Sequence, residues 1–548
     1  MVVNKKYGVV YTPYRLADFI AVLIKNEAAK ESYQIQTVID PACGEGALLE
    51  AMKLIENDNI KYYGIDVDNE AISNLSQRID KRTELFYEDA IIPSNECQSS
   101  DFWKRKIPTI STVIANPPWS SEKIYNKQQL ASAGFKFNSG QYDSYVLFIE
   151  LAYEILEYGG YFGFIIPDSI FESQNKNLRR FLAEKTQIKV IARLGEKIFE
   201  EVNRATTVII CRKIKPTKDD LTMCFRLNTE HRKQFLSSNI PLYDFYEREK
   251  HSVKQARFLM NANCNFDIDT RIDEEELLKK IKINCINLDD YFVFGRGVEI
   301  SKKGDIAICP FCGNGQGYTK KQLNAGKKKC VNCSEEFVLS DATLKCIIKN
   351  TSSKGYKRII VGEHVKRYFV MGESYIALDI PGINYKNDSL YTSPKLLIRK
   401  TGLGIYAGVD YSSGLTNQTV YILKYKQAKS VAPLEYFLAL LNSRVIYYYY
   451  LKLYGENEWK SHPYLTKDII FTLPLKIYTG DEIDKGIINL AKEISIEYSY
   501  QKDLMLEGLI MKRYNITALE RQMIIEEMKR LPDLGAINGM KFEGDINV

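Results

Sequence analysis

The feature that most constrains the fold of this chain is the apolar run Thr-Val-Ile-Ala at 112–115, which is followed directly by Asn-Pro-Pro-Trp. The apolar run favours a buried strand. Two successive prolines can neither continue that strand nor enter a helix interior, so the chain must turn in an extended conformation where the strand ends. In open α/β sheets ligands bind at this edge. There Asn116 and the Pro117 carbonyl can both accept from one exocyclic amine, and Trp119 offers a flat face to a heterocycle. A proline-rich turn behind a core strand is the alternative interpretation.

A second strand that ends in polar residues is predicted at 37–46, with the sequence Thr-Val-Ile-Asp-Pro-Ala-Cys-Gly-Glu-Gly. A helix is expected to follow from Ala47. Gly44 and Gly46 allow the backbone to approach a ligand closely, at the positive end of that helix. A glycine pair of this kind is a weak signal alone, and its weight comes from the segments that follow it.

Two further predicted strands end in acidic residues. The run at 62–65 leads to Asp66, whose carboxylate can accept both hydroxyls of a ribose, as in dinucleotide-binding folds. The run at 83–87 leads to Asp89, which suits the amine of an adenine ring. These strand ends predict a Rossmann-like α/β sheet that binds a nucleotide-type cofactor. A nicotinamide cofactor is disfavoured, because the glycine turn does not have the spacing Gly-x-Gly-x-x-Gly.

In their order along the chain, these motifs resemble those of gamma-class DNA N6-adenine methyltransferases, and the resemblance covers residues 7–213. It implies an S-adenosylmethionine site formed by Thr12, Asp40, Ala42, Gly44, Gly46, Asp66, Asp89 and Asn116. It implies a second set of residues that act on the target base, namely Asn116, Pro117, Trp119 and Phe199. Phe199 is expected to stack on the second face of the base. The sequence departs from the family pattern at Trp119, where tyrosine or phenylalanine is commoner. Thr12 has a further interpretation, as the cap of a helix with Pro13 at its first position.

The chemistry implied by the resemblance accounts for these residue types. An adenine amine is a poor nucleophile because its lone pair is delocalised into the ring. Two acceptors on its N–H groups localise that pair for in-line attack on a methyl sulfonium. A duplex base must be flipped out of the stack to reach such a site.

The expected activity is therefore methyl transfer from S-adenosylmethionine to N6 of adenine at a specific site in double-stranded DNA. The resemblance implies the modification enzyme of a restriction-modification system, and it leaves open a separate restriction endonuclease as a partner. Two alternatives remain: the same fold acting on RNA or on a protein glutamine amide, and a non-catalytic DNA-binding subunit. A fused nuclease is not expected, because no Pro-Asp…Glu-x-Lys cluster is found and the chain begins almost directly with the cofactor motif.

Composition limits the class of protein. The length of 548 residues predicts three to four domains, and 45% apolar residues can form large cores. No apolar run approaches 18 residues and no signal peptide opens the chain, so a cytoplasmic protein without membrane contact is expected. The net charge of +6 is compatible with a polyanionic partner without being diagnostic of one. Eleven cysteines without a secretory signal favour free thiols or metal ligands over disulfides.

Four of the cysteines form two Cys-x-x-Cys pairs separated by seventeen residues. This spacing can close one tetrahedral sulfur site, so a structural Zn²⁺ is predicted at Cys309, Cys312, Cys330 and Cys333. The residues between the pairs are rich in lysine, at positions 320, 321, 327, 328 and 329. Lysines on a zinc ribbon can follow DNA phosphates. A solvated lysine loop is the alternative.

The long second half must read bases and bind phosphates if the chain acts at a defined DNA sequence. Residues 295–300, Gly-Arg-Gly-Val-Glu-Ile, resemble the opening of the specificity domains of such enzymes. A predicted strand at 393–400 offers Lys395, Arg399 and Lys400 as candidate DNA contacts, with a solvated strand face as the alternative. The expected domains are an S-adenosylmethionine-binding catalytic domain at 1–214, a mixed α+β target recognition domain at 221–478 with an inserted zinc ribbon at 305–338, a C-terminal helical segment at 479–531 and a tail at 532–548.

Overall fold

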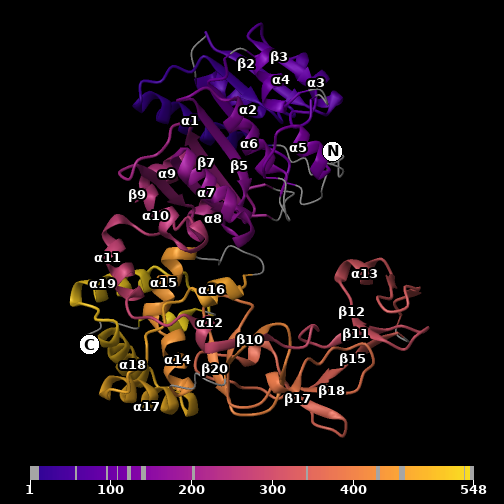
Figure 1. Cartoon of the computed structure of the whole chain (residues 1–548), viewed down its shortest axis with the longest axis vertical. Helices are drawn as coiled ribbons and strands as arrows, with labels where there is room; N and C mark the ends of the chain where they lie inside the picture. The colour runs from indigo at the N-terminus through magenta and orange to yellow at the C-terminus, as the bar shows by residue number, and fades with distance from the viewer. Residues whose placement is uncertain are drawn as a thin grey trace. The chain divides into compact units, whose positions relative to one another are not determined.

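The computed structural model of the chain describes residues 12–55, 59–93, 97–107, 109–119, 125–137, 143–199, 204–340, 343–426, 432–455, 463–535 and 537–542. The chain divides into two compact units (Figure 1). The first unit comprises Met1–Glu274 and Lys452–Lys460, and the second comprises Glu275–Leu451 and Ser461–Val548. Within the described ranges, none of the helices combines the length and the apolar character that a membrane span requires.

A nine-stranded sheet forms the centre of the first unit, with the order β3-β2-β1-β4-β5-β7-β6-β8-β9. Strands β1 to β5 pair in parallel, and β7 runs antiparallel between β5 and β6. The strands are β1 (Thr37–Asp40), β2 (Lys61–Asp66), β3 (Thr83–Tyr87), β4 (Thr112–Ala115), β5 (Tyr161–Pro167), β6 (Gln187–Gly195), β7 (Thr206–Arg212), β8 (Leu221–Arg226) and β9 (His251–Lys254). The predicted α/β sheet is thus confirmed.

The strand order reverses between β1 and β4, which lie side by side in parallel. From β1 the chain continues to β2 and β3 on one side, and it then returns to β4 on the other. The loops that follow β1 and β4 therefore leave in opposite directions and open a crevice at the carboxyl ends of the strands. The glycine turn follows β1 and the Asn-Pro-Pro-Trp run follows β4, so both flank this crevice.

Helices cover both faces of the sheet (Figure 1). In β4, Val113 and Ala115 pack with α4, α6 and α7, whereas Ile114 packs with α1, α2 and α9. A strand that is buried on both faces has no polar alternation, which explains the continuous apolar run at 112–115. The helices of the unit are α1 (Tyr14–Lys30), α2 (Ala47–Ile55), α3 (Asn69–Ser76), α4 (Ser99–Lys106), α5 (Lys127–Ser132), α6 (Tyr145–Ile155), α7 (Lys176–Lys185), α8 (Thr229–Ser237), α9 (Leu242–Glu249) and α10 (Gln255–Met260).

The first unit differs from the sequence expectation in its extent. Two more strands, β8 and β9, join the sheet after residue 214, and the compact unit reaches Glu274. The polar stretch at 214–220 is a turn that leads into β8. Because β8 pairs in parallel with β6, the sheet continues beyond this stretch. Polarity alone does not separate such a turn from a linker between domains.

A second difference concerns the polar segment at 120–141, which is predicted as a loop. Its described part contains α5, which begins with a capping box formed by Asn126 and Gln129. Residues 120–124 and 138–142 lie outside the described ranges, so the expectation of a loop near the target stays a prediction there.

Two four-stranded sheets organise the second unit, in the orders β10-β22-β19-β20 and β16-β18-β17-β21. Their strands are β10 (Phe292–Arg296), β22 (Val420–Tyr425), β19 (Lys395–Arg399), β20 (Ala407–Asp410), β16 (Ile348–Lys349), β18 (Tyr375–Ala377), β17 (Tyr356–Ile360) and β21 (Leu415–Thr416). The strand predicted at 393–400 is present as β19, and it pairs with β20 on one side and β22 on the other. A mixed α+β architecture is therefore confirmed for this half of the chain.

Lys395 on β19 is buried, so the prediction that it contacts DNA is wrong. Its ammonium lies 2.6 Å from the carboxylate of Asp410 on the neighbouring strand. It also donates to the backbone oxygens of Tyr391 and Ser412. These internal contacts engage the ammonium of Lys395. Burial lowers its pKa from the ordinary lysine value.

A small separate core is formed by residues 305–346. It contains α13 (Lys320–Asn324) and the strands β11 (Asp305–Ile308), β12 (Gly315–Gly317), β13 (Lys327–Lys329), β14 (Glu336–Val338) and β15 (Leu344–Cys346). β12, β11 and β15 form one sheet, and β13 and β14 form a hairpin. Phe337 and Leu339 are buried together with the predicted metal-binding cysteines.

The C-terminal region is helical, as predicted. Two consecutive helices, α14 (Leu434–Leu441) and α15 (Arg444–Tyr454), precede it in the chain. Between them Asn442 is buried and exchanges hydrogen bonds with the backbone of Ala407 through its side chain. The remaining helices of the unit are α11 (Glu275–Lys282), α12 (Leu288–Tyr291), α16 (Lys467–Phe471), α17 (Glu482–Ile496), α18 (Tyr500–Arg513) and α19 (Ala518–Lys529). Of the predicted tail, residues 536 and 543–548 lie outside the described ranges.

Candidate active site

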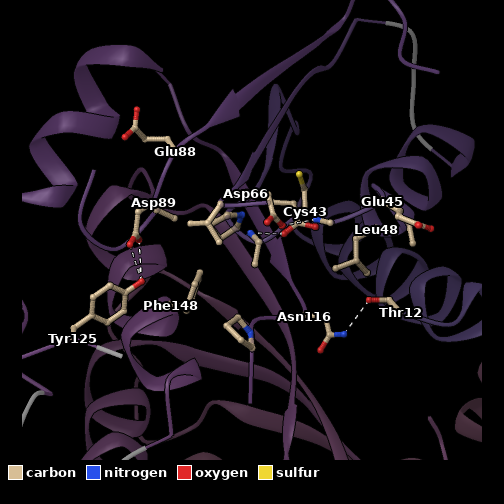
Figure 2. Close-up of a pocket in the computed structure, with 18 residues that line it drawn as sticks. Thr12, Cys43, Glu45, Leu48, Asp66, Glu88, Asp89, Asn116, Tyr125 and Phe148 are labelled. Carbon is tan, nitrogen blue, oxygen red and sulfur yellow. Dashed lines mark hydrogen bonds between the residues drawn. The ribbon is translucent and has the colours of Figure 1, made fainter. Parts of the chain in front are cut away.

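A cavity of about 260 Å³ opens at the carboxyl ends of β1, β2 and β4 (Figure 2). Seven of the residues predicted from the sequence line it, namely Thr12, Asp40, Ala42, Gly44, Asp66, Asp89 and Asn116. The structure thus brings together residues that are more than 100 positions apart in the chain. The remaining predicted residues, Gly46, Pro117, Trp119 and Phe199, are not among its lining residues.

The glycine turn and Asp66 are joined by a direct hydrogen bond. The Gly44 N–H donates to Asp66 Oδ2 at 2.7 Å, and the Asp68 N–H donates to Asp66 Oδ1 at 2.9 Å. Gly44 has a φ of +48°, and no atom lies within 4 Å of the position that a Cβ would occupy. The space beside this glycine is therefore open to a ligand. Gly46, at a φ of +84°, serves the fold, because a Cβ there would meet Leu75 at 2.6 Å.

Asp40, at the end of β1, is buried, with 1% of its surface exposed. Its carboxylate accepts the Ala42 N–H at 3.0 Å. Burial, and to a lesser extent the negative charge of Asp66, raise the pKa of Asp40 to about 8. Burial likewise raises the pKa of Asp66. A positive charge bound beside these two carboxyl groups would favour their ionised forms and lower both pKa values.

Asp89, after β3, is paired with a residue that sequence reasoning did not identify. The Tyr125 hydroxyl donates to both carboxylate oxygens of Asp89, at 3.0 and 2.9 Å. The Ile91 N–H also donates to Oδ1, at 2.8 Å. Tyr125 lies in the polar segment that is predicted only as a loop, and no periodicity or spacing marks it.

Asn116, after β4, reaches the start of the first helix. Its Nδ2 donates to Thr12 Oγ1 at 3.0 Å (Figure 2). The predicted capping role of Thr12 is wrong, because α1 begins at Tyr14 and Pro13 is its N-cap residue, without a side-chain cap. The threonine hydroxyl is therefore used at the cavity. Nδ2 is the donor in this bond, and Oδ1 is the acceptor atom of the amide.

Two side chains hold the backbone turn after Asn116 through hydrogen bonds. Ser144 Oγ donates to the Pro118 carbonyl, and Arg204 Nη1 donates to the Trp119 carbonyl at 2.5 Å. Arg204 is in turn fixed by an ion pair of 2.9 Å with Asp143. No hydrogen bond ends on the Pro117 carbonyl among the described residues. Within the described ranges, the Pro117 carbonyl thus differs from those of Pro118 and Trp119, which accept side-chain donors.

Trp119 and Phe199 contact each other. Their ring centroids lie 5.2 Å apart at an interplanar angle of 87°, and the rings are 8% and 2% exposed. An edge-to-face pair at this distance has no slot between the rings. A base can stack between them only if the two rings separate, so the proposed stacking roles require a rearrangement of this pair.

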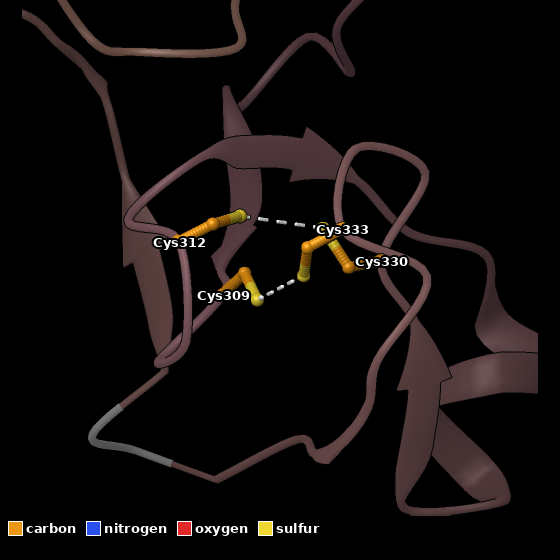
Figure 3. A group of neighbouring side chains, drawn as sticks. All are labelled: Cys309, Cys312, Cys330 and Cys333. Atoms are coloured by element: carbon orange, nitrogen blue, oxygen red, sulfur yellow. Dashed lines mark hydrogen bonds between the residues drawn. The ribbon is translucent and has the colours of Figure 1, made fainter.

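Four cysteines of the second unit form the only group in the described residues with the arrangement of a metal site (Figure 3). The Sγ atoms of Cys309 and Cys333 lie 3.7 Å apart, and those of Cys312 and Cys330 lie 3.6 Å apart. All four Sγ atoms lie within 4.8 Å of one another. The Asn332 N–H and the Asn314 side-chain amide donate to these sulfurs.

Sequence reasoning missed several residues at the cavity. Phe148 on α6, Leu48 on α2 and Glu88 after β3 line it, together with Tyr125. Phe148 sits in the apolar run of a helix that is buried almost all round, so the sequence gives no sign of which face meets the cavity. Arg204 was also missed, because neither its spacing nor its neighbours in the sequence indicate that it pairs with Asp143.

The comparisons with known proteins agree with this geometry. The chain is 30% identical over 216 residues to Type II methyltransferase M.BanIII of Aneurinibacillus aneurinilyticus. The matched residues make up 36% of this chain and 37% of that protein. It is 29% identical over 234 residues to Type II methyltransferase M.VspI of Vibrio sp. (strain 343), which covers 42% and 53% respectively. The matches thus span about half or less of these curated relatives.

Among solved structures, the chain is similar to the methyltransferase subunit of a type I restriction-modification system from Streptococcus thermophilus. The identity is 18% and the TM-score 0.38, over 48% of this chain and 59% of that one.

Two family matches divide the chain. Residues 357–475 match the TaqI-like C-terminal specificity domain, which lies within the predicted target recognition region. Residues 2–280 match the N-6 DNA Methylase family and include every described residue of the cavity. Because this match spans just over half of the 548 residues, the chain belongs to the N-6 DNA methylase family.

Proposed function

We propose that the protein transfers a methyl group from S-adenosylmethionine to N6 of a flipped adenine at a specific site in double-stranded DNA, as the modification enzyme of a restriction-modification system. The observation that carries the proposal is that Asn116 shares one cavity with Gly44 and Asp66. The strand reversal between β1 and β4 thereby places an amide acceptor beside a nucleotide-type site.

The residues present fit the cofactor. Asp66 would accept the ribose hydroxyls and Asp89 the adenine amine, and the open space beside Gly44 would admit the part of the cofactor next to the ribose. The buried Asp40 would lie near the positive charge of the bound cofactor, and this charge would favour the ionised form of the Asp40 carboxyl group. When bound, S-adenosylmethionine supplies a methyl group on a sulfonium.

Two acceptors of this chain would act on the target amine. Asn116 Oδ1 and the Pro117 carbonyl would each accept one N–H, which localises the nitrogen lone pair toward the methyl group. Thr12 holds the Asn116 amide, while Ser144 and Arg204 hold the neighbouring carbonyls, so the turn is preorganised. No strong base is needed, because the methylated ammonium is acidic. No covalent enzyme intermediate is expected, so none of the cysteines is a nucleophile.

The target base would enter the site outside the duplex. Flipping exposes the amine and allows the base to stack on an aromatic ring. Trp119 lies in the turn after Asn116 and contacts Phe199, and separation of the two rings would open a place for the base. The specificity-domain match at 357–475 supports recognition of duplex DNA rather than of RNA or protein.

We also propose a structural Zn²⁺ on the four cysteines. Zn–S bonds of about 2.3 Å in a tetrahedron place the sulfurs about 3.8 Å apart. The observed separations of 3.6 and 3.7 Å fit this value. Elemental analysis should find one zinc per chain. Cys309→Ser should lose the metal, whereas Cys346→Ser, an exposed cysteine outside the cluster, should keep it.

The activity is tested by incubating the protein with S-adenosylmethionine labelled in its methyl group and with plasmid DNA, total RNA or a protein mixture. Label should appear in DNA alone, and single-molecule sequencing of DNA from an expressing host should show N6-methyladenine in one sequence motif. Asn116→Ala should bind the cofactor normally and lose most turnover. Label in RNA or protein but not in DNA, or near-normal turnover of Asn116→Ala, would contradict the proposal.

A further inference from the structure

Residues 301–349, which we call the basic ribbon, lie between the two segments that match known families. They contain the four-cysteine cluster and the strands around it. This stretch carries nine lysines and four acidic residues, a net charge of +5, whereas the whole chain has a net charge of +6. Nearly all of the chain's excess positive charge is thus concentrated in less than a tenth of its length.

Most of this charge is not neutralised within the protein. Five lysines of the basic ribbon are exposed and make no ion pair in the described ranges, namely Lys303, Lys320, Lys321, Lys329 and Lys345. Within the described ranges, the ribbon lysines with acidic partners are Lys302 and Lys327, which pair with Glu363 and Glu336. In the helices of the same unit, by contrast, exposed lysines such as Lys485 face a glutamate one turn away.

The lysines stand on a rigid support. In β13, Lys328 points inward and is 8% exposed, so its neighbours Lys327 and Lys329 point to the opposite face. The prediction that all five lysines between the cysteine pairs can follow phosphates is therefore wrong for Lys328. Lys320 and Lys321 open α13, where the helix dipole disfavours cations. Two neighbouring cations at the start of a helix repel each other and lower the stability of the fold. We take this cost as an indication that the lysines bind an external anionic partner.

We propose that the basic ribbon binds the phosphate backbone of duplex DNA and adds sequence-independent contacts to those of the specificity domain. This inference rests on the proposed function, because it takes duplex DNA as the substrate. Duplex DNA carries one negative charge per about 1.7 Å of helix axis, and lysines bind it as point charges. The four-cysteine cluster and the buried Phe337 hold the lysines in place.

The test measures the salt dependence of DNA binding by the full chain. The probe is a fluorescent duplex of mixed sequence, about 40 base pairs long, and the salt range is about 50 to 200 mM. In the variant Lys320→Gln, Lys321→Gln, Lys329→Gln, the slope of log K against log salt should become shallower by about 0.9 for each phosphate that is no longer neutralised by a lysine. We expect this for at least two of the three lysines, with the largest fall in affinity at low salt.

A charge-matched control is available in the first unit. Lys185, Lys215 and Lys218 are exposed and lie just before β6 and β8, at the amino ends of parallel strands and thus at the edge opposite the cavity. Changing these three lysines to glutamine removes the same charge and should leave the slope unchanged. A second variant, Lys303→Gln with Lys345→Gln, leaves the segment between the cysteine pairs intact. It should make the slope shallower by about 0.9 for each of the two lysines that binds a phosphate in the wild type.

The outcomes separate this inference from the proposed function. If both ribbon variants keep the zinc content and melting temperature of the wild type and also keep its salt slope, the inference is overturned. It is equally overturned if the control variant changes the slope as much as the ribbon variants do, because the effect would then be one of bulk charge. If the wild type methylates DNA but the ribbon variants keep its salt slope, the role of the basic ribbon alone is refuted. If the wild type does not methylate DNA, the proposed function is refuted.

Discussion

The side-chain amide of Asn116 donates a hydrogen bond of 3.0 Å to the hydroxyl of Thr12 across 104 positions of sequence. This bond joins the segment before the first helix to the residue after β4. It gives Thr12 a task that does not require contact with the cofactor, namely to hold the acceptor face of Asn116 toward the cavity. Thr12 is a positioning residue in this scheme, and the amide is the group that touches the target amine.

Replacing Thr12 by valine tests this role. The isosteric change removes the hydroxyl, so the Asn116 amide loses this hydrogen bond. The loss of one hydrogen bond of about 0.5 to 1.5 kcal/mol should lower kcat at saturating cofactor roughly 2- to 10-fold. Thr12→Ser should restore the rate. A change confined to the dissociation constant of the cofactor, with kcat intact, would instead assign Thr12 to the cofactor alone.

Asp40→Asn is expected to stabilise the protein when no cofactor is bound. The pKa of Asp40 is raised to about 8 in the folded chain by burial, whereas the unfolded chain releases this proton near pH 4. Between these values the unfolded state binds fewer protons, so the carboxyl group lowers stability progressively as the pH rises, and the loss is complete above pH 8. At pH 8 the asparagine variant should therefore be more stable by at least about 1.4 kcal/mol, the equivalent of one pKa unit. Thermal melting at pH 5 and pH 8 checks this, and an equal effect at both pH values would contradict the assignment.

The same carboxyl group should make cofactor binding depend on pH. A cation in the cavity favours the ionised form of Asp40, so affinity for S-adenosylmethionine should rise as the pH approaches 8. Because one proton is released, the slope cannot exceed a factor of ten per pH unit. Calorimetric titrations of the wild type and of Asp40→Asn isolate the effect, since the titration of the ligand itself is common to both. Parallel pH profiles would show that Asp40 does not sense the cofactor.

The sequence predicts the strands of the first unit well because their apolar runs are buried on both faces and end in residues that break the strand. Asp66, Asp89 and Asn116 could be placed for the same reason, since each follows such a run closely. Tyr125 and Arg204 could not be predicted, because their roles depend on how loops fold back over the sheet. A side chain supplied by a loop leaves no periodic trace in the sequence.

The sequence is least informative about what a side chain meets in the folded protein. Lys395 and Arg399 look alike on a predicted strand, yet Lys395 is buried against Asp410 and Arg399 is partly exposed. Residues four apart point to the same face of a strand, so the difference comes from the neighbours that each side chain meets along that face, and the sequence does not show those neighbours. The contact between Trp119 and Phe199 is a similar case, because two aromatic residues expected on opposite sides of a base pack on each other.

Lys395→Met should destabilise the second unit without changing DNA contacts. The change leaves Asp410 buried without its cation, which typically costs about 3 to 5 kcal/mol. The double change Lys395→Met, Asp410→Leu removes both charges and should recover most of that stability. Denaturant unfolding followed by tryptophan and tyrosine fluorescence measures both variants. A double variant as unstable as the single one would show that the pair is not the source of the effect.

Tyr125→Phe is expected to strengthen cofactor binding. The Tyr125 hydroxyl lies within hydrogen-bond distance of both carboxylate oxygens of Asp89, and the Ile91 N–H also donates to Oδ1, so an adenine amine that binds Asp89 would compete with the tyrosine for this carboxylate. Removing one hydrogen bond of about 0.5 to 1.5 kcal/mol from the unliganded state should raise the affinity for S-adenosylmethionine roughly 2- to 10-fold. Tyr158→Phe, on an exposed tyrosine of the same unit, is the matched control and should have no effect. Weaker binding by Tyr125→Phe would mean that the hydroxyl orients Asp89 for the cofactor instead of competing with it, and isothermal titration calorimetry distinguishes the two by the sign of the change in affinity.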